Sequence, residues 1–575
     1  MRPLFIHSDN TSLLNKIDQS WWDTEKFVIT DYADIDFQLH DFIVNKIANK
    51  ISSAIFIKLA LSDNYLEFIG LRLGLHIRLT DQFPKIQNLP IVFLGEEKIE
   101  ELFRLFEYPE FLISQGVYIS TEDDPDFHAI ADKLVNGKLQ SCLSINKFLG
   151  RINIKPTDDT ISNHSISNEW SIYQWSKTLS VNNDVINSVI GKVKTSLYFK
   201  YLATSVNLVD TGIVDLTKLK LRNDTVANIL LVDDDADKGW YELLCVLLSD
   251  INNLENFNYL GEELKHHSKN EIVEIVVGNI IENNIDIVIL DFRIHPSDYE
   301  VLDIEEVTGV RILRAIKKLN PGIQIIIFSA TEKVWNLQLM QKLGINAFVL
   351  KDSPRNSGLN PAIKSISHLV SAMDECLGKL FLKDFYIKYS KLQDELIPRK
   401  RKKNVNCLPA DFVDEVLKWF ELSCSILLND MSISSRTASF LFLFSVLENL
   451  SNRLIDVDNP IEVPNTDPIR YMFEFRSSHQ KLKKFTEDKV NLGYYRKTTE
   501  DLKTTKRVIP WLAKIQNAIE FVSDDELKED ELSNIVKTRN DLIHANTTTG
   551  KKAEITAELL ISLNKLVYDG LIKIV

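Results

Sequence analysis

The sequence has few cysteines, no long apolar run and no excess of positive charge, and each absence excludes a class of protein. Only 5 of its 575 residues are cysteine, and no Cys-x-x-Cys pair occurs, so neither a zinc ribbon nor a disulfide framework is expected. The densest apolar stretch, 438–447, is far shorter than the roughly twenty residues of a membrane-spanning helix. The amino terminus shows no signal-peptide pattern. We therefore expect an intracellular, cytoplasmic protein that makes no membrane contact.

The charge balance is acidic. The chain carries 67 Lys and Arg against 81 Asp and Glu, a formal net charge of −14. A whole-chain basic footprint for DNA is therefore absent, and any contact with nucleic acid must be a local patch. The apolar share of 45% and the charged share of 26% are ordinary for globular proteins and exclude a mainly disordered or fibrous chain. At about 150 residues per domain, the length predicts three or four domains.

Short, unbroken apolar runs in the middle of the chain are typical of strands buried on both faces of a parallel sheet. Helical patterns alternate with them, and this alternation predicts a doubly wound α/β domain at 226–360. The expected strands are Asn228–Val232, Asp286–Leu290, Ile323–Phe328 and Ala347–Leu350, and the expected helices are Gly239–Leu248, Glu271–Glu282, Val307–Lys318 and Val334–Leu343.

Residues 1–125 repeat this α/β pattern more faintly. A helical connector at 126–225 is expected to follow the first domain, and a helical linker at 361–408 to follow the second. The expected elements are strands at Leu4–Ile6, Ala54–Ile57, Ile91–Leu94 and Val117–Ile119, a helix at Tyr65–Leu73, and linker helices at Pro361–Leu377 and Leu382–Leu396 that end at a basic break, Pro398–Lys403.

From Pro409 onward every apolar pattern has the i, i+3, i+4 spacing of helices. This predicts an all-α domain of bundle type at 409–575. The proline-containing segment 456–467 is expected to be a loop inside it. The expected helices are Phe412–Leu428, Ser435–Leu454, Leu532–Leu542 and Glu554–Ile574.

Polar residues stand where each expected strand of the middle domain ends. Asp233 and Asp234 follow the first, Asp291 the second, Ser329 the third and Lys351 the last. Ligands of open α/β sheets bind beyond this edge. Three gathered carboxylates favour Mg²⁺, and a lysine with a hydroxyl beside them would hold a phosphoryl group.

This order of residues resembles the receiver domain of bacterial response regulators, a flavodoxin-like fold. The matching segments are ILLVDDD (229–235), IVILDF (287–292), IIIFSAT (325–331) and FVLK (348–351). The resemblance implies phosphorylation by a histidine kinase or another phosphodonor, with Asp291 as the phosphoacceptor, Asp233, Asp234, Asp291 and the backbone carbonyl of Arg293 as Mg²⁺ ligands, and Ser329 and Lys351 as contacts of the phosphoryl group.

Two features depart from the receiver pattern. The gap from Asp234 to Asp291 is long (291 − 234 = 57), and residues 254–269 look like an insertion within it. Asp352 follows Lys351 in place of the usual proline. The alternative interpretation is a generic α/β domain whose strand ends are acidic.

The first region lacks this chemistry. Aligning the strands of the two regions places His7 and Ser8 at the acidic pair, Lys58 at the phosphoacceptor, Gly95 at the serine and Thr121 at the lysine. With no carboxylate to phosphorylate, the region resembles a degenerate receiver kept for docking or dimerisation. An unrelated α/β domain is the alternative.

One segment of the all-α region, RNDLIH (539–544), carries a motif. The spacing alone is weak evidence, but the motif closes a helix and is followed by a turn and a long final helix. This arrangement resembles the HEPN superfamily, many of whose members are metal-independent ribonucleases. The resemblance implies Arg539 and His544 as catalytic residues, with Asn540 as the polar residue beside them.

The residue types suit RNA cleavage. Attack by the 2′-hydroxyl needs a proton acceptor near neutral pH, which imidazole supplies, and a guanidinium stabilises the phosphate oxygens. Residues five apart point 140° apart on a straight helix (500° − 360°), so Arg539 and His544 need a bent helix end or a second copy. The family resemblance implies a homodimer. The alternative is that Asn540 and His544 hydrogen-bond on the helix surface while Arg539 pairs with an acid. The basic run 399–403 is a solvated linker or an RNA contact.

These features together predict a response regulator whose phosphorylation controls a C-terminal HEPN-type endoribonuclease, with Mg²⁺ in the receiver and no cofactor at the RNA site. Such an output fits stress response or phage defence. The alternative is a phosphorylation-dependent adaptor whose helical domain binds a partner. A transcription factor is a third option, but no helix-turn-helix with a basic recognition helix is visible, so sequence-specific DNA binding is not expected.

Overall fold

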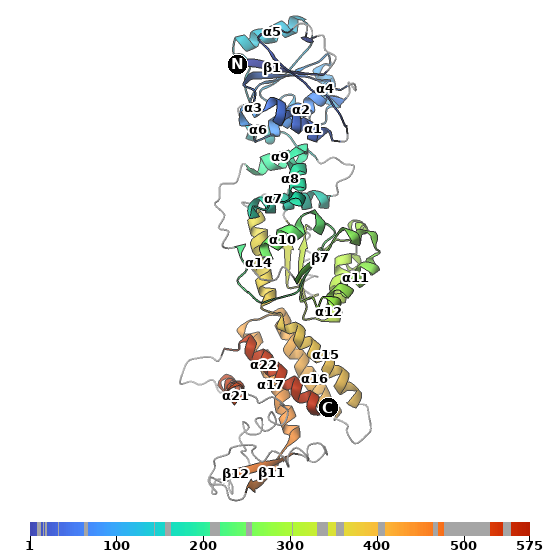
Figure 1. Cartoon of the computed structure of the whole chain (residues 1–575), viewed down its shortest axis with the longest axis vertical. Coiled ribbons are helices and arrows are strands. Elements are labelled where there is room, and N and C mark those ends of the chain that lie inside the picture. Colours follow the sequence, from blue (N-terminus) through green and yellow to red (C-terminus); the bar gives the residue numbers. More distant parts are fainter. Residues whose placement is uncertain are drawn as a thin grey trace.

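The computed structural model arranges the chain as four parts stacked along one long axis, with two α/β units, a helical connector between them and a helical unit at the C-terminal end (Figure 1). The structure describes residues 1–8, 13–14, 17, 20–32, 34–62, 67–122, 124–142, 144–155, 163–207, 219–248, 256–301, 303–330, 343–351, 361–400, 409–463, 470–475, 529–543 and 554–574.

The first unit is a five-stranded parallel sheet in the order β2-β1-β3-β4-β5. Its three inner strands are almost wholly buried, as their unbroken apolar runs predict. The strands are β1 (Arg2–His7), β2 (Asp23–Lys26), β3 (Ser52–Lys58), β4 (Ile91–Leu94) and β5 (Val117–Ser120), and the helices are α1 (Ile35–Phe42), α2 (Ile69–Leu79), α3 (Pro84–Gln87), α4 (Ile99–Leu105), α5 (Asp124–Val135) and α6 (Ile145–Leu149).

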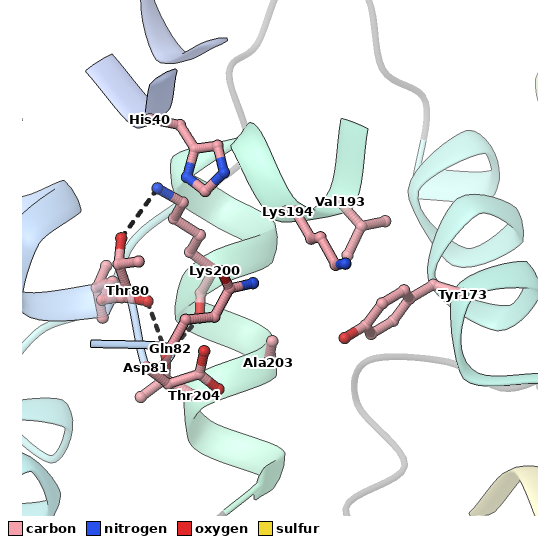
Figure 2. A pocket seen from close by; sticks show the side chains of 11 residues that line it. His40, Thr80, Asp81, Gln82, Tyr173, Val193, Lys194, Lys200, Ala203 and Thr204 are labelled. Atoms are coloured by element: carbon pink, nitrogen blue, oxygen red, sulfur yellow. Dashed lines mark hydrogen bonds between the residues drawn. The ribbon is translucent and has the colours of Figure 1, made fainter. Parts of the chain in front are cut away.

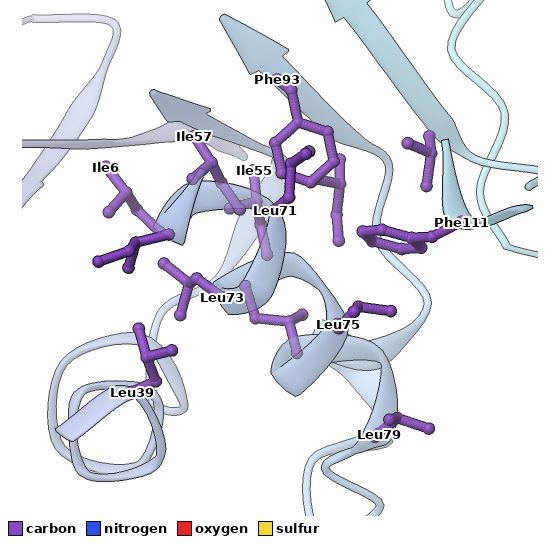
Figure 3. Close-up of a cluster of buried hydrophobic side chains, with 14 of the residues drawn as sticks. Ile6, Leu39, Ile55, Ile57, Leu71, Leu73, Leu75, Leu79, Phe93 and Phe111 are labelled. Atoms are coloured by element: carbon purple, nitrogen blue, oxygen red, sulfur yellow. The ribbon is translucent and has the colours of Figure 1, made fainter. Parts of the chain in front are cut away.

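The helix α2 is apolar on almost every side and is correspondingly buried. Figure 3 shows Leu71 and Leu73 of this helix against Ile55 and Ile57 of β3. The remaining side of α2 packs against α9 (Leu197–Asn207) of the connector. This helix therefore joins the first unit to the connector.

The predicted strands of the first unit are confirmed, but the sequence missed its edge strand and its first helix. The strand β2 has the sequence DTEK and is half-exposed, so it carries no apolar run that could have revealed it. The predicted boundary at 125 falls inside α5, whose Ile130 packs in the core under the sheet. The first unit therefore extends beyond that boundary.

The connector consists of α7 (Asn163–Leu179), α8 (Asp184–Thr195) and α9. The helix α8 contacts α1, and α7 contacts the second unit at α10 (Trp240–Leu248) and α14 (Pro361–Leu377). Trp175 of α7 packs edge-on against Trp240 and donates a hydrogen bond to Ser365 of α14 at 3.0 Å. The connector thus holds both α/β units.

The second unit repeats the topology of the first, with parallel strands in the order β7-β6-β8-β9-β10. Together the two sheets confirm the prediction of two doubly wound α/β units. The strands are β6 (Ile229–Val232), β7 (Phe257–Leu260), β8 (Ile287–Leu290), β9 (Gln324–Ser329) and β10 (Ala347–Leu350), and the further helices are α11 (Lys269–Glu282) and α12 (Thr308–Leu319). The helix predicted at 334–343 lies outside the described residues, apart from its last position.

The interpretation of 254–269 as an insertion is wrong. This segment contains the edge strand β7 and a short 3-10 helix at Glu262–His266. Only one side of an edge strand pairs, and Asn258 and Tyr259 face solvent, which removes the continuous apolar run that marks an inner strand. The segment is therefore an integral part of the sheet.

The expected linker at 361–408 divides between two cores. The helix α14 packs against the second sheet, with Ile366 and Met373 buried. The helix α15 (Phe381–Lys400) begins the core of the C-terminal unit with Leu382 and Phe385, and it continues past the predicted break at Pro398. The second unit therefore ends near Leu377.

The C-terminal unit is mainly helical, and its predicted helices are confirmed. They are α15, α16 (Ala410–Asn429), α17 (Ile433–Leu454), α21 (Glu529–Ile543) and α22 (Ala557–Ile574). The predicted loop at 456–467 is wrong over 456–463, where β11 (Ile455–Val463) pairs antiparallel with β12 (Arg470–Phe475) and the register shifts before Pro460; residues 464–467 lie outside the described residues. The prolines of this segment led to the prediction of a loop. A proline has no N–H to donate, but it is tolerated in a strand where a register shift interrupts the hydrogen bonds between the strands. No helix in the described residues combines the length and apolarity of a membrane span.

Candidate functional site

Three buried carboxylates meet at one edge of the second sheet. Asp233 and Asp234 follow β6, and Asp291 follows β8, which is the neighbouring strand. Each offers an oxygen that lies within 4.8 Å of the others. Asp233 and Asp291 are fully buried, and Asp234 is 6% exposed. Because parallel strands end at the same edge, the sequence order alone was sufficient to predict this cluster.

Lys351, which follows β10, contacts two of the three carboxylates. Its Nζ is 2.8 Å from Asp233 Oδ2 and 3.0 Å from Asp291 Oδ2, and the side chain is fully buried. The same ammonium lies over the rings of Trp240 and Phe328, at 5.1 and 5.3 Å. Burial alone would lower the pKa of Lys351, but the two carboxylates raise it above its usual value. This lysine remains charged and compensates part of the acidic charge.

The negative charge of Asp234 is less well compensated than that of Asp233 and Asp291, which both contact Lys351. Burial, followed by the charges of Asp235, Asp233 and Asp291, raises the pKa of Asp234 to about 7. Its Oδ1 is buried and has no hydrogen-bond partner among the described residues. Hard carboxylate oxygens at this spacing, one of them unpartnered, fit a Mg²⁺ ion.

The other predicted site residues lie at the same edge. Ser329 ends β9, is fully buried, and its hydroxyl has no partner among the described residues. The amide nitrogen of Arg293 is 3.4 Å from Asp291 Oδ1, and its guanidinium lies over the ring of Tyr299 at 5.5 Å. The role of the Arg293 carbonyl as a metal ligand stays a prediction.

Sequence reasoning missed a second layer of contacts around Asp235. This carboxylate is 2.8 Å from Lys238, 3.0 Å from Lys265 and 2.5 Å from the side-chain amide of Asn168, which belongs to α7. Lys265 also reaches Asp234 at 3.4 Å and comes from the segment misread as an insertion. The third aspartate of the DDD run was the available signal, but two of its three partners lie 30 and 67 positions away in sequence.

At the corresponding edge of the first unit, an ion pair has its acidic and basic residues at exchanged positions. The pairing of β1 with β3 continues to His7 opposite Lys58, as that of β6 with β8 continues to Asp233 opposite Asp291. Followed through the next strands, this register places Glu122, not the predicted Thr121, at the position of Lys351. Lys58 Nζ lies 3.6 Å from Glu122 Oε1. The acid–base pair of the second unit is therefore reversed here, and the predicted place of Gly95 opposite Ser329 is consistent with the register.

A shared glycine supports this alignment of the two units. Gly70 is the second residue of α2, the helix that follows β3, and Gly309 is the second residue of α12, which follows β8. Their amides donate to the carbonyls of Leu59 and Phe292, one residue after Lys58 and Asp291. The first unit has kept the backbone geometry of the site and lost its carboxylates.

The predicted ribonuclease residues are only partly described. Arg539 lies on α21, and its Nη2 is 3.4 Å from Glu448 Oε1 of α17. Its guanidinium also lies over the Phe444 ring at 5.8 Å. Asn540 is the next residue of α21, but its side chain, like the whole of His544, lies outside the described residues. Whether His544 joins Arg539 stays a prediction.

Two residues of the basic run 399–403 form ion pairs. Arg399 lies 3.8 Å from Glu395 on the same helix, and Lys400 forms an ion pair with Asp414 of α16. Residues 401–403 lie outside the described residues.

Comparison with known proteins supports a receiver relationship at the N-terminal end. The family model "Inactive Receiver domain" matches residues 9–120, which confirms the prediction of a degenerate receiver there. Two crystal structures of NtrX from Brucella abortus also match. The structure in complex with ADP is 14% identical, with a TM-score of 0.21, and the match covers 58% of this chain and 84% of that chain. The second structure is 12% identical, with a TM-score of 0.20, and the match covers 58% of this chain and 86% of that chain. No curated protein matches.

Proposed function

We propose that this chain is a response regulator in which Asp291 of the second α/β unit accepts a phosphoryl group. The observation that carries the proposal is the gathering of Asp233, Asp234 and Asp291, two of which contact the buried ammonium of Lys351. Structural cores rarely bury three carboxylates together, because each loses its hydration, whereas phosphoryl transfer requires such a charged cluster.

The residues divide the chemistry between them. A carboxylate oxygen of Asp291 attacks the phosphorus of the donor, and the bond from phosphorus to the leaving atom breaks. The leaving atom is the carboxylate oxygen of acetyl phosphate or the imidazole nitrogen of a phosphohistidine. Mg²⁺, held by Asp233, Asp234 and Asp291, would neutralise charge on the transferred group. Lys351 gives up its contact with Asp291 and donates to a phosphoryl oxygen instead, and the unpartnered hydroxyl of Ser329 donates to another.

Phosphorylation of the purified chain tests this assignment. With acetyl phosphate and Mg²⁺, wild-type protein should gain one phosphoryl group by intact mass, and beryllofluoride should raise its melting temperature. Asp291→Asn should do neither, and the exposed control Asp303→Asn should behave as wild type. Phosphorylation of Asp291→Asn to the wild-type level would exclude this acceptor.

For the C-terminal unit, we propose a metal-independent endoribonuclease of HEPN type, acting as a homodimer on RNA. The support is the RNDLIH segment, of which residues 539–543 lie on a helix that packs into a helical unit, with Arg539 partly exposed at its surface. In such a site His544 would take the proton of the 2′-hydroxyl, and Arg539 would stabilise the phosphate oxygens. A stress or defence role follows from this analogy alone.

One observation favours the second candidate, a non-catalytic adaptor. Arg539 is paired with Glu448, as the alternative interpretation of the motif requires. A guanidinium held by a carboxylate on a neighbouring helix can serve packing alone, and the unit would then dock a partner protein.

Incubation with total RNA separates the two candidates. The full-length chain is assayed without added metal and with Mg²⁺ and acetyl phosphate, beside His544→Ala and the exposed control Lys537→Ala. Cleavage by wild type and Lys537→Ala, with at least a hundredfold loss in His544→Ala, supports the ribonuclease. Intact RNA under every condition selects the adaptor.

A further inference from the structure

A pocket lies at the joint between the first α/β unit and the connector, away from the acidic cluster (Figure 2). The space between its walls is about 390 Å³, and part of this space is open solvent. Its walls come from α1 and the carboxyl end of α2 on one side, and from α7, α8 and α9 on the other. Pockets between structural units are frequent sites for small ligands.

The wall contains a buried lysine whose contacts are with neutral groups. Lys200 of α9 is 5% exposed, and its Nζ lies 3.0 Å from His76 Nδ1 and 3.1 Å from Thr80 Oγ1. His76 donates from Nε2 to Asp36, so its Nδ1 is the acceptor of a neutral ring. No carboxylate within the described part of the chain lies within ion-pair distance of Lys200. Burial accordingly lowers the pKa of Lys200 to about 7, against the weaker effects of Asp36 and Asp81.

Further donors face the same space. Lys194 of α8 and Tyr173 of α7 extend into the pocket from one side, and His40 of α1 lies beside Lys200 (Figure 2). The Nδ1 atom of His40 is buried and has no hydrogen-bond partner among the described residues. Asp81 is the one carboxylate in the lining, against two ammonium groups. The excess of donors and of positive charge favours an anionic ligand.

We propose that this pocket binds a small oxyanion of the phosphate class beside the ammonium of Lys200, with Lys194 and Tyr173 facing it from the opposite wall. Each ammonium has three donors, and Lys200 uses two of them on Thr80 and His76. An oxyanion would accept a hydrogen bond from the third donor of Lys200. It would also place a negative charge beside this ammonium, where the described residues place no carboxylate within ion-pair distance. Because the pocket is open on one side, an organic group attached to the phosphate would extend toward solvent.

This site is independent of the proposed phosphoacceptor, but it is linked to the same connector. The anion would contact both α8 and α9 and would lie against α1 and α2, so its binding would fix the first unit on the connector. The connector in turn contacts Asp235 through Asn168. A ligand that favours one arrangement of this joint would therefore bias the second unit as well.

Calorimetric titration of the full-length chain tests the site. The probes are inorganic phosphate, a sugar phosphate and a nucleoside monophosphate, at constant ionic strength and without Mg²⁺, so that the acidic cluster does not contribute. We expect one site per chain, with equal binding to Asp291→Asn. The relative affinities of the three probes distinguish free phosphate from a phosphorylated small molecule.

Variants locate the binding. Lys200→Met should weaken binding at least tenfold, Lys194→Gln and Tyr173→Phe should weaken it several-fold, and Lys46→Met on the surface of the same unit should leave it unchanged. If Lys200→Met fails to fold, the two partly exposed variants decide. No heat with any probe, or binding that neither Lys194→Gln nor Tyr173→Phe alters, would overturn the proposal.

Discussion

At the scale of single residues, the two α/β units differ most in one ion pair at the sheet edge, whose acidic and basic residues have exchanged positions. The second unit has an acid at the acceptor position and a lysine after its last strand, at 3.0 Å. The first has Lys58 and Glu122 at these positions, at 3.6 Å, with side chains 16% and 17% exposed. Both arrangements neutralise the sheet edge, but only the second unit has a carboxylate at this position beside an acidic pair.

A charge exchange tests the structural role of this pair. Lys58→Glu should destabilise the first unit by about 1–2 kcal/mol, because it places two carboxylates at a partly buried edge. The double variant Lys58→Glu/Glu122→Lys should recover most of that loss in urea unfolding followed by hydrogen exchange in β3. Additive losses in the double-mutant cycle would show that the two side chains do not interact.

Lys200 should make stability depend on pH in phosphate-free buffer. Its folded pKa, about 7, lies below its usual value, so the folded state releases a proton above pH 7 that the unfolded state keeps until about pH 10. The unfolded state then binds more protons, and the free energy of unfolding rises with pH across this window, by up to about 4 kcal/mol. Hydrogen exchange in α2 and α9 measures the effect, and Lys200→Met should abolish it. An equal slope in this variant would assign the effect to other groups.

At the scale of elements, a strand–loop–helix unit brings the acceptor residue and the next helix into close contact in both sheets. A Cβ atom on Gly309 would lie 2.5 Å from the carbonyl oxygen of Phe292 and 2.7 Å from that of Asp291. A Cβ atom on Gly70 would lie 2.1 Å from the carbonyl oxygen of Lys58. Because these neighbours are backbone atoms, neither position has room for a side chain.

Two helical glycines of the second unit form a matched pair for a test. Gly309→Ala should lower the free energy of unfolding by about 2–4 kcal/mol and slow phosphorylation at least tenfold, since the loop that carries Asp291 must move. Gly278→Ala on α11, where nothing lies within 4 Å of the new Cβ, should instead raise stability by about 0.5–1 kcal/mol. Urea unfolding and acetyl phosphate labelling measure both. Equal stability of the two variants would contradict the close approach.

At the scale of the whole molecule, the connector links the candidate site to the first unit. Asn168 of α7 donates to Asp235 and accepts from the indole of Trp240 at 3.4 Å, and Trp175 packs against Phe328 at 5.5 Å. Trp240 and Phe328 also contact the ammonium of Lys351. A shift of Lys351 toward a phosphoryl group would therefore change the surface on which α7 rests.

Hydrogen exchange with and without beryllofluoride and Mg²⁺ measures this coupling. Wild type should show altered protection in α7, whereas Asn168→Leu should lose most of the change, because an apolar side chain cannot bond to Asp235. The exposed control Asn187→Leu on α8 should respond as wild type. A full response in Asn168→Leu would place the coupling elsewhere, for example through Trp175.

The sequence by itself determined the inner strands and the position of the acidic cluster. Inner parallel strands are apolar on both faces, and residues that follow adjacent strands must meet at one edge, so Asp233, Asp291 and Lys351 could be brought together without coordinates. Edge strands carry no such signal, which is why β2 and β7 were missed.

Only the tertiary structure decided which residues pair across distant elements. The register of β5, the contact of Asn168 with Asp235, the position of Lys265 and the pocket around Lys200 all depend on how separate elements pack. Local patterns of hydrophobicity extend over single helices and strands, whereas ion pairs and pockets form between elements, so their partners cannot be identified from spacing alone.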